Sequence, residues 1–333
     1  MKQISFADLN SGFEINKKRT KKQIFLEEMD TIVPWKKMVE LIKPYTAYSE
    51  IKQKGRPPFP IETMMRIHFM QQWFGLSDPA MEESLHDIPL YRNFAKLDSG
   101  MTRLPDESTI LRFRHLLEEN KLAHQIFQIV NEKLGEKNLF LREGTSMDAT
   151  LIAAPSSTKN NTRTRDPQMH STKKGTNYYF GMKAHIGVDC DSGLVHTVTT
   201  TPANDHDITQ AQNLLHGEEK FMVGDSGYIG IEKRPEIQKK MKDMKRPIEW
   251  LVCMKPGKRK QLKENKTWGK LIDQAEKIKS RMRANVEFQF RVLKCQFGYR
   301  KVRYKGLMKN TLQIVTLFAL SNLFMARKKL MGI

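Results

Sequence analysis

Residues 178–202, YYFGMKAHIGVDCDSGLVHTVTTTP, decide the fold of this 333-residue chain. Apolar residues occupy every second position from Met182 to Val188. That period of two is typical of a strand with one buried face. The Asp-Ser-Gly segment at 191–193 is a turn signal, and a second β-rich run follows it. This stretch therefore predicts a β-hairpin of two antiparallel strands.

The elements on either side of the hairpin predict an α/β domain. The run before it, TSMDATLIA, has the composition of a strand, whereas residues 156–177 lack an apolar stripe and predict a basic loop. Strands and helices then alternate to the end of the chain, which predicts a layered domain with a mixed sheet. The expected elements are strands near 145–153, 221–225 and 249–256, and helices near 208–217, 231–241, 270–297 and 307–330.

The first 140 residues predict only helices. Apolar residues recur at helical spacing in 61–75, where Gly75 marks the end of a helix. Ser77 has a side chain that can cap the next helix, and a further helical run opens with Pro105 and Asp106. We therefore expect an all-α domain over residues 1–140 and an α/β domain over 141–333. Short helices with tight turns are compatible with a helix-turn-helix, and equally with a plain helical bundle.

The charge of the chain favours a polyanionic partner. Lys and Arg number 57 against 37 Asp and Glu, a net charge of +20. Such an excess repels itself in the compact state, and binding to a nucleic acid would offset that repulsion. A solvated basic surface is the alternative explanation. The basic residues that we single out for DNA contact are Lys159, Arg163, Arg165, Lys173 and Lys174 in the polar loop, and Arg112 and Arg114 in the helical part.

Cysteine usage and hydropathy favour a cytoplasmic protein. The three cysteines are scattered and show no zinc-binding spacing, which predicts reduced, structural thiols. Residues 1–10, MKQISFADLN, do not resemble a signal peptide. The most apolar stretch, 307–330, is interrupted by polar residues that include Lys309 and Asn322. We expect it to be a packed core helix rather than a membrane span.

Three acidic residues occupy positions where a divalent metal ion could use them. Asp148 is the only charge in its strand, and Asp225 ends the next isolated strand before a glycine. Glu287 follows Arg283 by four residues and precedes Lys294 by seven, so the three share one helical face. Carboxylates on separate elements suit Mg²⁺ or Mn²⁺, and two such ions can promote phosphoryl transfer. Each acid alone also has a structural explanation, as a turn former or a surface ion pair.

Other residues compete for roles near these acids. Asp189, Asp205 and Asp207 are alternative acid positions. Asp189 ends the second strand close to the expected position of Asp148, and could orient a metal-bound water. His206 could assist the metal ligands, although a loop histidine satisfied by its neighbours is the simpler interpretation.

On these residues the chain resembles a DDE transposase of a bacterial insertion sequence. The resemblance is to the insertion-sequence family five group, within the larger four/five superfamily, and it covers nearly the whole chain. Residues 57–122 resemble the N-terminal helical domain of these enzymes. Residues 144–324 resemble their catalytic domain, which implies a ribonuclease H-like fold.

Three motifs carry the resemblance. They are the SMDAT strand with Asp148, the VGDSGY strand with Asp225, and the R-x3-E-x6-K pattern that ends at Lys294. The segment TPANDHD, residues 201–207, also resembles the family. One position departs from the superfamily signature. The signature has a Tyr three residues before the Arg, and this chain has Ser280 there. Any contact that this Tyr makes to DNA is therefore in doubt.

The resemblance implies a function and its partners. Asp148, Asp225 and Glu287 would be catalytic and would bind two Mg²⁺ or Mn²⁺ ions, with Arg283 and Lys294 beside the DNA phosphates. The partners would be double-stranded DNA, as terminal inverted repeats and target DNA, and a second copy of the chain. The enzyme would act in the cytoplasm, at the nucleoid. A nuclease without strand transfer and an inactive DNA-binding regulator are the alternatives.

Overall fold

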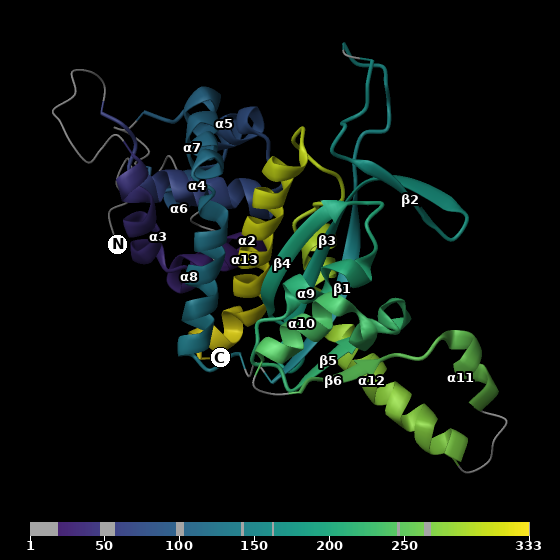
Figure 1. Cartoon of the computed structure of the whole chain (residues 1–333). Coiled ribbons are helices and arrows are strands. Elements are labelled where there is room, and N and C mark those ends of the chain that lie inside the picture. Colours follow the sequence, from purple (N-terminus) through teal and green to yellow (C-terminus); the bar gives the residue numbers. More distant parts are fainter. Residues whose placement is uncertain are drawn as a thin grey trace.

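The computed structural model describes residues 19–46, 57–97, 103–140, 143–161, 163–244, 247–262 and 268–332. An N-terminal group of helices lies on one side and a mixed sheet on the other, with the last helix between them (Figure 1).

The N-terminal part is helical, as its periodicity predicts, and its helix ends follow from local side chains. Gly75 takes a left-handed conformation, with φ of 69°, and ends α4. The Ser77 hydroxyl accepts a hydrogen bond from the Ala80 amide, and Asp106 accepts one from Thr109. These caps confirm the predicted starts of α5 and α7. The elements are α2 (Lys21–Ile32), α3 (Trp35–Ile42), η1 (Lys43–Tyr45), α4 (Ile61–Phe74), α5 (Asp78–Asp87), α6 (Pro89–Phe94), α7 (Glu107–Glu119) and α8 (Leu122–Glu136).

The sheet has the mixed topology that the fold class requires. Neighbouring strands run in the order β4-β3-β1-β5-β6. The pairs β4–β3 and β3–β1 are antiparallel, and the pairs β1–β5 and β5–β6 are parallel. This order confirms the predicted α/β domain with a mixed sheet. The strands are β1 (Gly144–Ala153), β2 (His170–Lys174), β3 (Asn177–Asp189), β4 (Val195–Pro202), β5 (Phe221–Gly224) and β6 (Glu249–Val252).

Strand β2 corrects one expectation. The sequence predicts a loop over residues 170–174, but these residues form a strand that pairs with the beginning of β3. The paired residues run from Lys174 opposite Asn177 to His170 opposite Gly181. Four of the five side chains of β2 are exposed. A strand that buries neither face has no apolar alternation, so periodicity could not reveal it.

Helices cover both faces of the sheet. The expected long helices form as α12 and α13, and a π-helical turn extends α12. The helix expected near 208–217 is reduced to one short turn, α9. The remaining elements are η2 (Asp207–Gln210), α9 (Ala211–Leu214), η3 (Ser226–Tyr228), η4 (Ile231–Lys233), α10 (Pro235–Asp243), α11 (Pro256–Leu262), α12 (Trp268–Arg291), η5 (Val292–Gln296) and α13 (Leu307–Met331).

Strand alternation divides the buried side chains into two clusters. Ile152 of β1 packs into the larger cluster with α12 and α13, whereas Met147 points to a smaller cluster with α9 and α10. Because alternate residues share a face, Asp148 lies on the same face as Ile152. The face that carries Asp148 is therefore the one that α12 covers.

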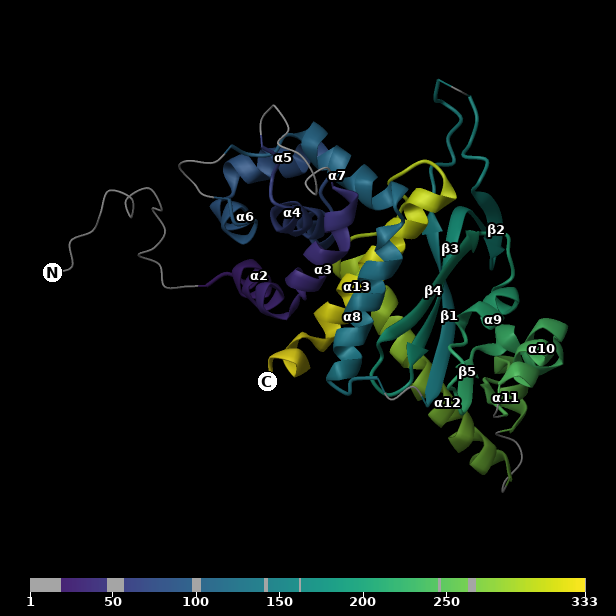
Figure 2. The ribbon, with the colours of Figure 1, turned by 60° about the vertical axis from the view of Figure 1, so that its left-hand side comes forward.

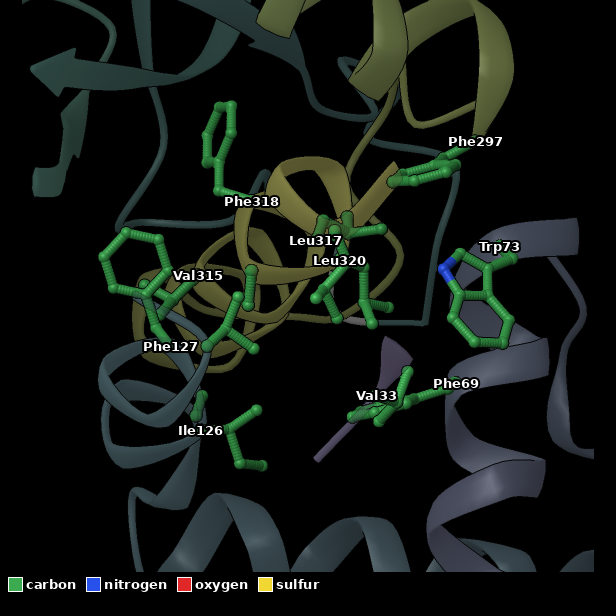
Figure 3. Packing of buried hydrophobic residues seen from close by; sticks show 14 of the residues in the cluster. Val33, Phe69, Trp73, Ile126, Phe127, Phe297, Val315, Leu317, Phe318 and Leu320 are labelled. Atoms are coloured by element: carbon green, nitrogen blue, oxygen red, sulfur yellow. The ribbon is translucent and has the colours of Figure 1, made fainter. Parts of the chain in front are cut away.

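Helix α13 joins the two parts of the chain. Figure 2 shows it between the N-terminal helices and the sheet. In Figure 3, Leu320 of α13 lies between Ile126 of α8 and Trp73 of α4. One hydrophobic cluster extends from α2 to α13. A division at residue 140 thus separates two kinds of secondary structure that share one core.

Polar residues within α13 bind backbone groups rather than solvent. Asn322 is fully buried, accepts a hydrogen bond from the Val195 amide at 2.8 Å and donates one to the Val195 carbonyl at 2.7 Å. It also donates to Asn131 of α8. Buried Asn310 accepts from the amides of Arg303 and Tyr304. These bonds explain why a packed helix contains so many polar residues and confirm the predicted core helix.

Across the residues that the structure describes, we find no helix with the length and apolar character needed to cross a membrane.

Candidate active site

Two strands bring Asp148 and Asp225 together. Strands β1 and β5 pair in parallel, with Ser146 opposite Val223. Continuing that register by two residues places Asp225 opposite Asp148. Residues paired in this way on parallel strands point to the same face, about 4.8 Å apart along the hydrogen-bonding direction. The two carboxylates therefore face the same side of the sheet at the carboxyl end of β5.

The surroundings of Asp148 make its carboxyl group hard to ionise. Burial raises its pKa to about 6, and the negative charge of Asp225 contributes in the same direction. The Ala149 amide donates a hydrogen bond of 2.7 Å to Asp148 Oδ1, and the charge of Arg283 opposes the rise. Two carboxylates whose charges act on each other favour a cation between them. This donor chemistry fits a hard divalent ion.

The turn after β5 fixes Asp225. Its Oδ1 accepts a hydrogen bond of 2.8 Å from the Gly227 amide, so the side chain caps the short helix η3. A Cβ on Gly227 would lie 2.9 Å from that same oxygen. A Cβ on Gly224 would lie 3.1 Å from the ring of Tyr228. Both glycines in VGDSGY are thus needed for close approach.

Arg283 connects the first and third acids. Its Nη1 lies 3.3 Å from Asp148 Oδ2, and its Nη2 lies 2.9 Å from Glu287 Oε1. The side chain of Glu287 is 59% exposed and that of Asp148 only 20%. Within the described ranges, no three His, Cys, Asp or Glu side chains lie close enough together to hold a metal ion. Glu287 is thus linked to Asp148 through Arg283.

Lys294 is anchored near the far end of β1. Its Nζ donates a hydrogen bond of 2.8 Å to the Leu151 carbonyl from the π-helical turn η5. Burial lowers its pKa, and the charges of Lys174 and Arg300 lower it further. Three cations in one place favour an anionic ligand. Ser280, at the departing position of the motif, donates its hydroxyl to the Glu276 carbonyl within the helix.

Asp189 shapes a turn and does not have the expected position beside a metal-bound water. It is 1% exposed, and its Oδ1 accepts hydrogen bonds from the Asp191 and Ser192 amides and from the Ser192 hydroxyl. These bonds shape the β3–β4 turn. The proposed role of Asp189 at a metal-bound water is therefore wrong, because its carboxylate is engaged in the hairpin.

Of the neighbouring residues His206 and Asp207, it is Asp207 that lies closer to the charges of the site. The His206 side chain is exposed, and its carbonyl caps η2. Asp207 Oδ1 lies 2.9 Å from Lys183 Nζ and 3.8 Å from His185 Nδ1. Its negative charge also helps to raise the pKa of Asp148. Asp207 is thus the acid beside the site that sequence reasoning ranked too low, and its signal was the TPANDHD segment.

The environment of Tyr228 belongs to the same region. Its hydroxyl is buried and has no hydrogen-bond partner in the described structure. Burial raises the pKa of the phenol well above its ordinary value, and the charges of Asp207, Asp148 and Asp225 add to the effect. The aromatic ring packs in the smaller cluster beneath the acids. Tyr228 is therefore a packing residue whose polar end faces the acidic region.

The predicted DNA-binding residues fall into three groups. Lys159, Arg163 and Arg165 lie exposed on the loop between β1 and β2, and Lys173 and Lys174 lie exposed on β2. Arg165 lines a hollow of about 580 Å³ together with Arg303 and Lys305. Arg112 is exposed on α7 and lines a second hollow, of about 490 Å³.

Arg114 is the exception. It is 8% exposed, its guanidinium pairs with Asp78 and Glu118 at 2.9 and 2.8 Å, and it lies over the ring of Tyr304. A guanidinium that is buried and paired with two carboxylates cannot reach a DNA phosphate. The expectation that Arg114 contacts DNA is therefore wrong.

Comparison with known families gives two matches on this chain. A family model described as a transposase DDE domain matches residues 140–323, more than half of the chain, and one described as a transposase domain matches residues 13–116. The first includes Asp148, Asp225 and Glu287.

Solved structures give only distant similarities. The Mos1 strand transfer complex has 12% identity, covering 74% of this chain and 70% of that one, with a TM-score of 0.18. The Mos1 transposase paired-end complex with the left transposon end has 11% identity, covering 88% and 93%, with a TM-score of 0.20. Scores this low carry no argument about fold or function.

Proposed function

The chain belongs to the DDE transposase family, and from that premise we propose the reaction that it performs. It binds the terminal inverted repeats of an insertion sequence, cuts a DNA strand to free a 3′-OH, and joins that 3′-OH to target DNA. The observation that supports this most directly is that Asp148 lies in β1 and Asp225 directly follows β5, its parallel neighbour, while Glu287 is linked to Asp148 through Arg283.

The acidic residues would act through divalent ions. Two Mg²⁺ or Mn²⁺ ions held by Asp148, Asp225 and Glu287 would activate the attacking hydroxyl and stabilise the leaving oxygen. Arg283 can exchange a carboxylate for a phosphate, because a guanidinium binds either group through the same pair of N–H donors. Lys294, anchored on β1, would contact a phosphate on the other side of the acids.

The remaining basic residues would hold the DNA. A chain of net charge +20 gains affinity for duplex DNA from the release of counterions. Two transposon ends must be joined in one event, so two copies of the chain would act together on DNA. The phosphate contacts would come from Lys159, Arg163, Arg165, Lys173, Lys174 and Arg112.

The two parts of the chain would divide the work. Residues 1–140 would read the inverted repeat, and residues 141–333 would perform the chemistry. The substrate is chromosomal DNA, so we propose that the enzyme acts in the cytoplasm, at the nucleoid.

A cleavage and joining assay tests this proposal. Purified protein is incubated with Mg²⁺ and a duplex carrying the inverted repeats read from the DNA on either side of this gene. Wild type should give cut and joined products. Asp225→Ala should give neither, yet should bind the duplex as before, because the basic surface is unchanged.

Asp191→Ala, at an exposed position of the β3–β4 turn, is the matched control and should react like wild type. If Asp225→Ala cuts as well as wild type, the metal-ligand assignment is wrong. Cutting without joining by wild type would favour the nuclease alternative. Binding without any cutting would favour the regulator.

A further inference from the structure

Strands β2 and β3 extend beyond the sheet as a two-stranded arm, residues 170–181. Figures 1 and 2 both show it projecting from the body of the molecule. Most of its side chains are exposed on both faces. A two-stranded hairpin without packing on either face is only marginally stable in water. The arm therefore has the exposure expected of a segment that meets a partner.

The composition of the arm selects a polyanion as that partner. The arm contains Lys173 and Lys174 and has no Asp or Glu. Lys173 Nζ lies 5.5 Å from the centre of the Tyr178 ring, and Tyr178 is 74% exposed. A lysine beside a free aromatic face suits a phosphate next to a sugar or base.

Strand register places part of the arm on the same face as the acids. Ile186 of β3 lies opposite Asp148 of β1. Tyr178 precedes Ile186 by eight residues, an even number, so both point to the same face of the sheet. Lys173 pairs with Tyr178 and shares that face. Tyr179, the adjacent residue, points to the opposite face.

A second aromatic–cation pair continues this face toward the sheet. Phe180 lies two residues from Tyr178, and the guanidinium of Arg165 lies 5.4 Å from its ring centre. Arg165 comes from the loop before β2, so two separate segments supply cations to the same row. Beyond Phe180 this face of β3 is buried, because Met182, Ala184 and Ile186 pack in the larger hydrophobic cluster. The exposed part of the face is therefore confined to the arm.

We infer that the face of the arm carrying Lys173 and Tyr178 binds the DNA duplex on which the acids act, at a fixed distance from the cut. The inference rests on the proposed function. Eight residues of strand span about 26 Å. That length corresponds to about eight base pairs of B-form DNA, at 3.4 Å per base pair. The major groove is wide enough to admit a two-stranded ribbon.

Each residue has its own contribution to this contact. Lys173 would neutralise one phosphate, which adds affinity that salt weakens. Tyr178 would pack against the sugar and base edges in the groove, a contact that does not depend on salt in the same way. Removing each side chain should therefore give a different signature in binding measurements.

The test uses full-length protein and duplexes that carry the inverted repeat nearest this gene. The long duplex extends about two helical turns to either side of the cut. Two trimmed duplexes keep that length on one side and have only about four base pairs on the other, one for each side of the cut. Tyr178→Ala should weaken binding to the long duplex by about tenfold. It should bind like wild type to the duplex that lacks the contacted side. Lys173→Ala should make the logarithmic salt dependence shallower by about one.

Tyr179→Ala is the matched control, because it removes the same side chain from the opposite face of the arm. Its binding to the long duplex should equal that of wild type, and Tyr178→Phe should retain most of the affinity. The inference is overturned if Tyr178→Ala binds the long duplex like wild type. It is also overturned if Tyr179→Ala gives the same loss, or if Tyr178→Ala loses affinity equally for both trimmed duplexes.

The cleavage assay separates this inference from the proposed function. If wild type cuts and joins DNA but the Tyr178 variants behave as Tyr179→Ala does, the arm assignment fails and the transposase assignment stands. If wild type itself does not cut DNA, the proposed function fails. The contact of the arm is then tested by footprinting, which measures the protection of bases about eight pairs from the repeat end. Protection that Tyr178→Ala removes supports the arm contact, and its absence contradicts it.

Discussion

Two arginines in this protein form nearly the same set of ion pairs but differ in burial. Arg114 and Arg283 each bind a glutamate four residues later on the same helix, and each reaches an aspartate from another element. The side chain of Arg114 is 9% exposed and is covered by Tyr304, whereas that of Arg283 is 28% exposed.

The difference lies in the carboxylates more than in the arginines. The acids that hold Arg114 are themselves largely buried, with Glu118 at 11%. Glu287, the partner of Arg283, is 59% exposed and free to exchange its partner. A closed network of this kind holds helices together, whereas an open one can accept a metal ion or a phosphate. The surroundings, and not the R-x3-E pattern, distinguish structure from chemistry.

The largest effect should come from opening the closed network. Arg114→Ala would leave Asp78 without its ion-pair partner and Glu118 with only Lys309, at 3.9 Å. Removing one partner of a buried ion pair typically costs about 3–5 kcal/mol of stability. Chemical denaturation at neutral pH would measure it. Arg112→Ala, on the exposed side of the same helix, should change stability by less than about 0.5 kcal/mol. Equal losses for the two variants would show that Arg114 is not structural.

The next effect concerns the open network. Glu287→Gln should lower DNA cleavage by at least about a hundredfold, because a charge used in phosphoryl transfer is removed. Its stability should change little, since an exposed i,i+4 pair contributes only a few tenths of a kcal/mol. A large loss of stability together with normal cleavage would reverse the roles that we give the two networks.

Acid should weaken the closed region through His68, which lies beside Arg114 and Asp78. Burial lowers the pKa of His68 to about 4, and the charge of Arg114 adds to the effect. Below pH 6.5 the unfolded chain takes up a proton that the folded chain refuses, so stability falls as the pH drops from about 6.5 to 4. The loss from this group is about 2 kcal/mol at pH 5.

His68→Leu should remove that part of the pH dependence. Above about pH 8 the imidazole is neutral in both states, so the stability profiles of variant and wild type should run parallel there. Profiles that run parallel down to pH 5 would contradict the assignment. His185, which is also buried with a pKa of about 4, should contribute in the same direction in both proteins.

The smallest effect on stability should come from Arg283→Gln. Its two ion pairs are partly exposed, so their loss should cost less than about 1 kcal/mol. Denaturation alongside Arg114→Ala provides the comparison. A cost as large as that of Arg114→Ala would mean that Arg283 supports the fold more than the site.

Periodicity and turn residues were sufficient to predict most strands and a mixed sheet, and to single out two of the three proposed acids. Asp148 and Asp225 could be placed because each follows from its position on a strand, and neighbouring parallel strands meet at one edge. The helix pattern also placed Glu287 beside Arg283. Family membership supports that triad, and its metal-binding role stays a proposal.

The remaining features depend on contacts between distant segments. Sequence alone could not separate Arg114 from Arg283, because burial by Tyr304 is a property of the folded chain. Asp207 was underestimated because a loop, and not a strand, brings its charge near Asp148. Strand β2 was missed because exposure on both faces removes the alternation that marks a strand.

The position of α13 has a consequence for how the protein is made. The helix lies near the end of the chain, yet it packs against α2, α8 and β4. A ribosome must therefore synthesise the chain through α13 before the helices made first can bury their apolar sides. A gene copy interrupted before Leu307 would release a polypeptide with those surfaces exposed, which is expected to aggregate or be degraded rather than retain partial activity. Loss of the segment that encodes α13 should thus silence the whole enzyme.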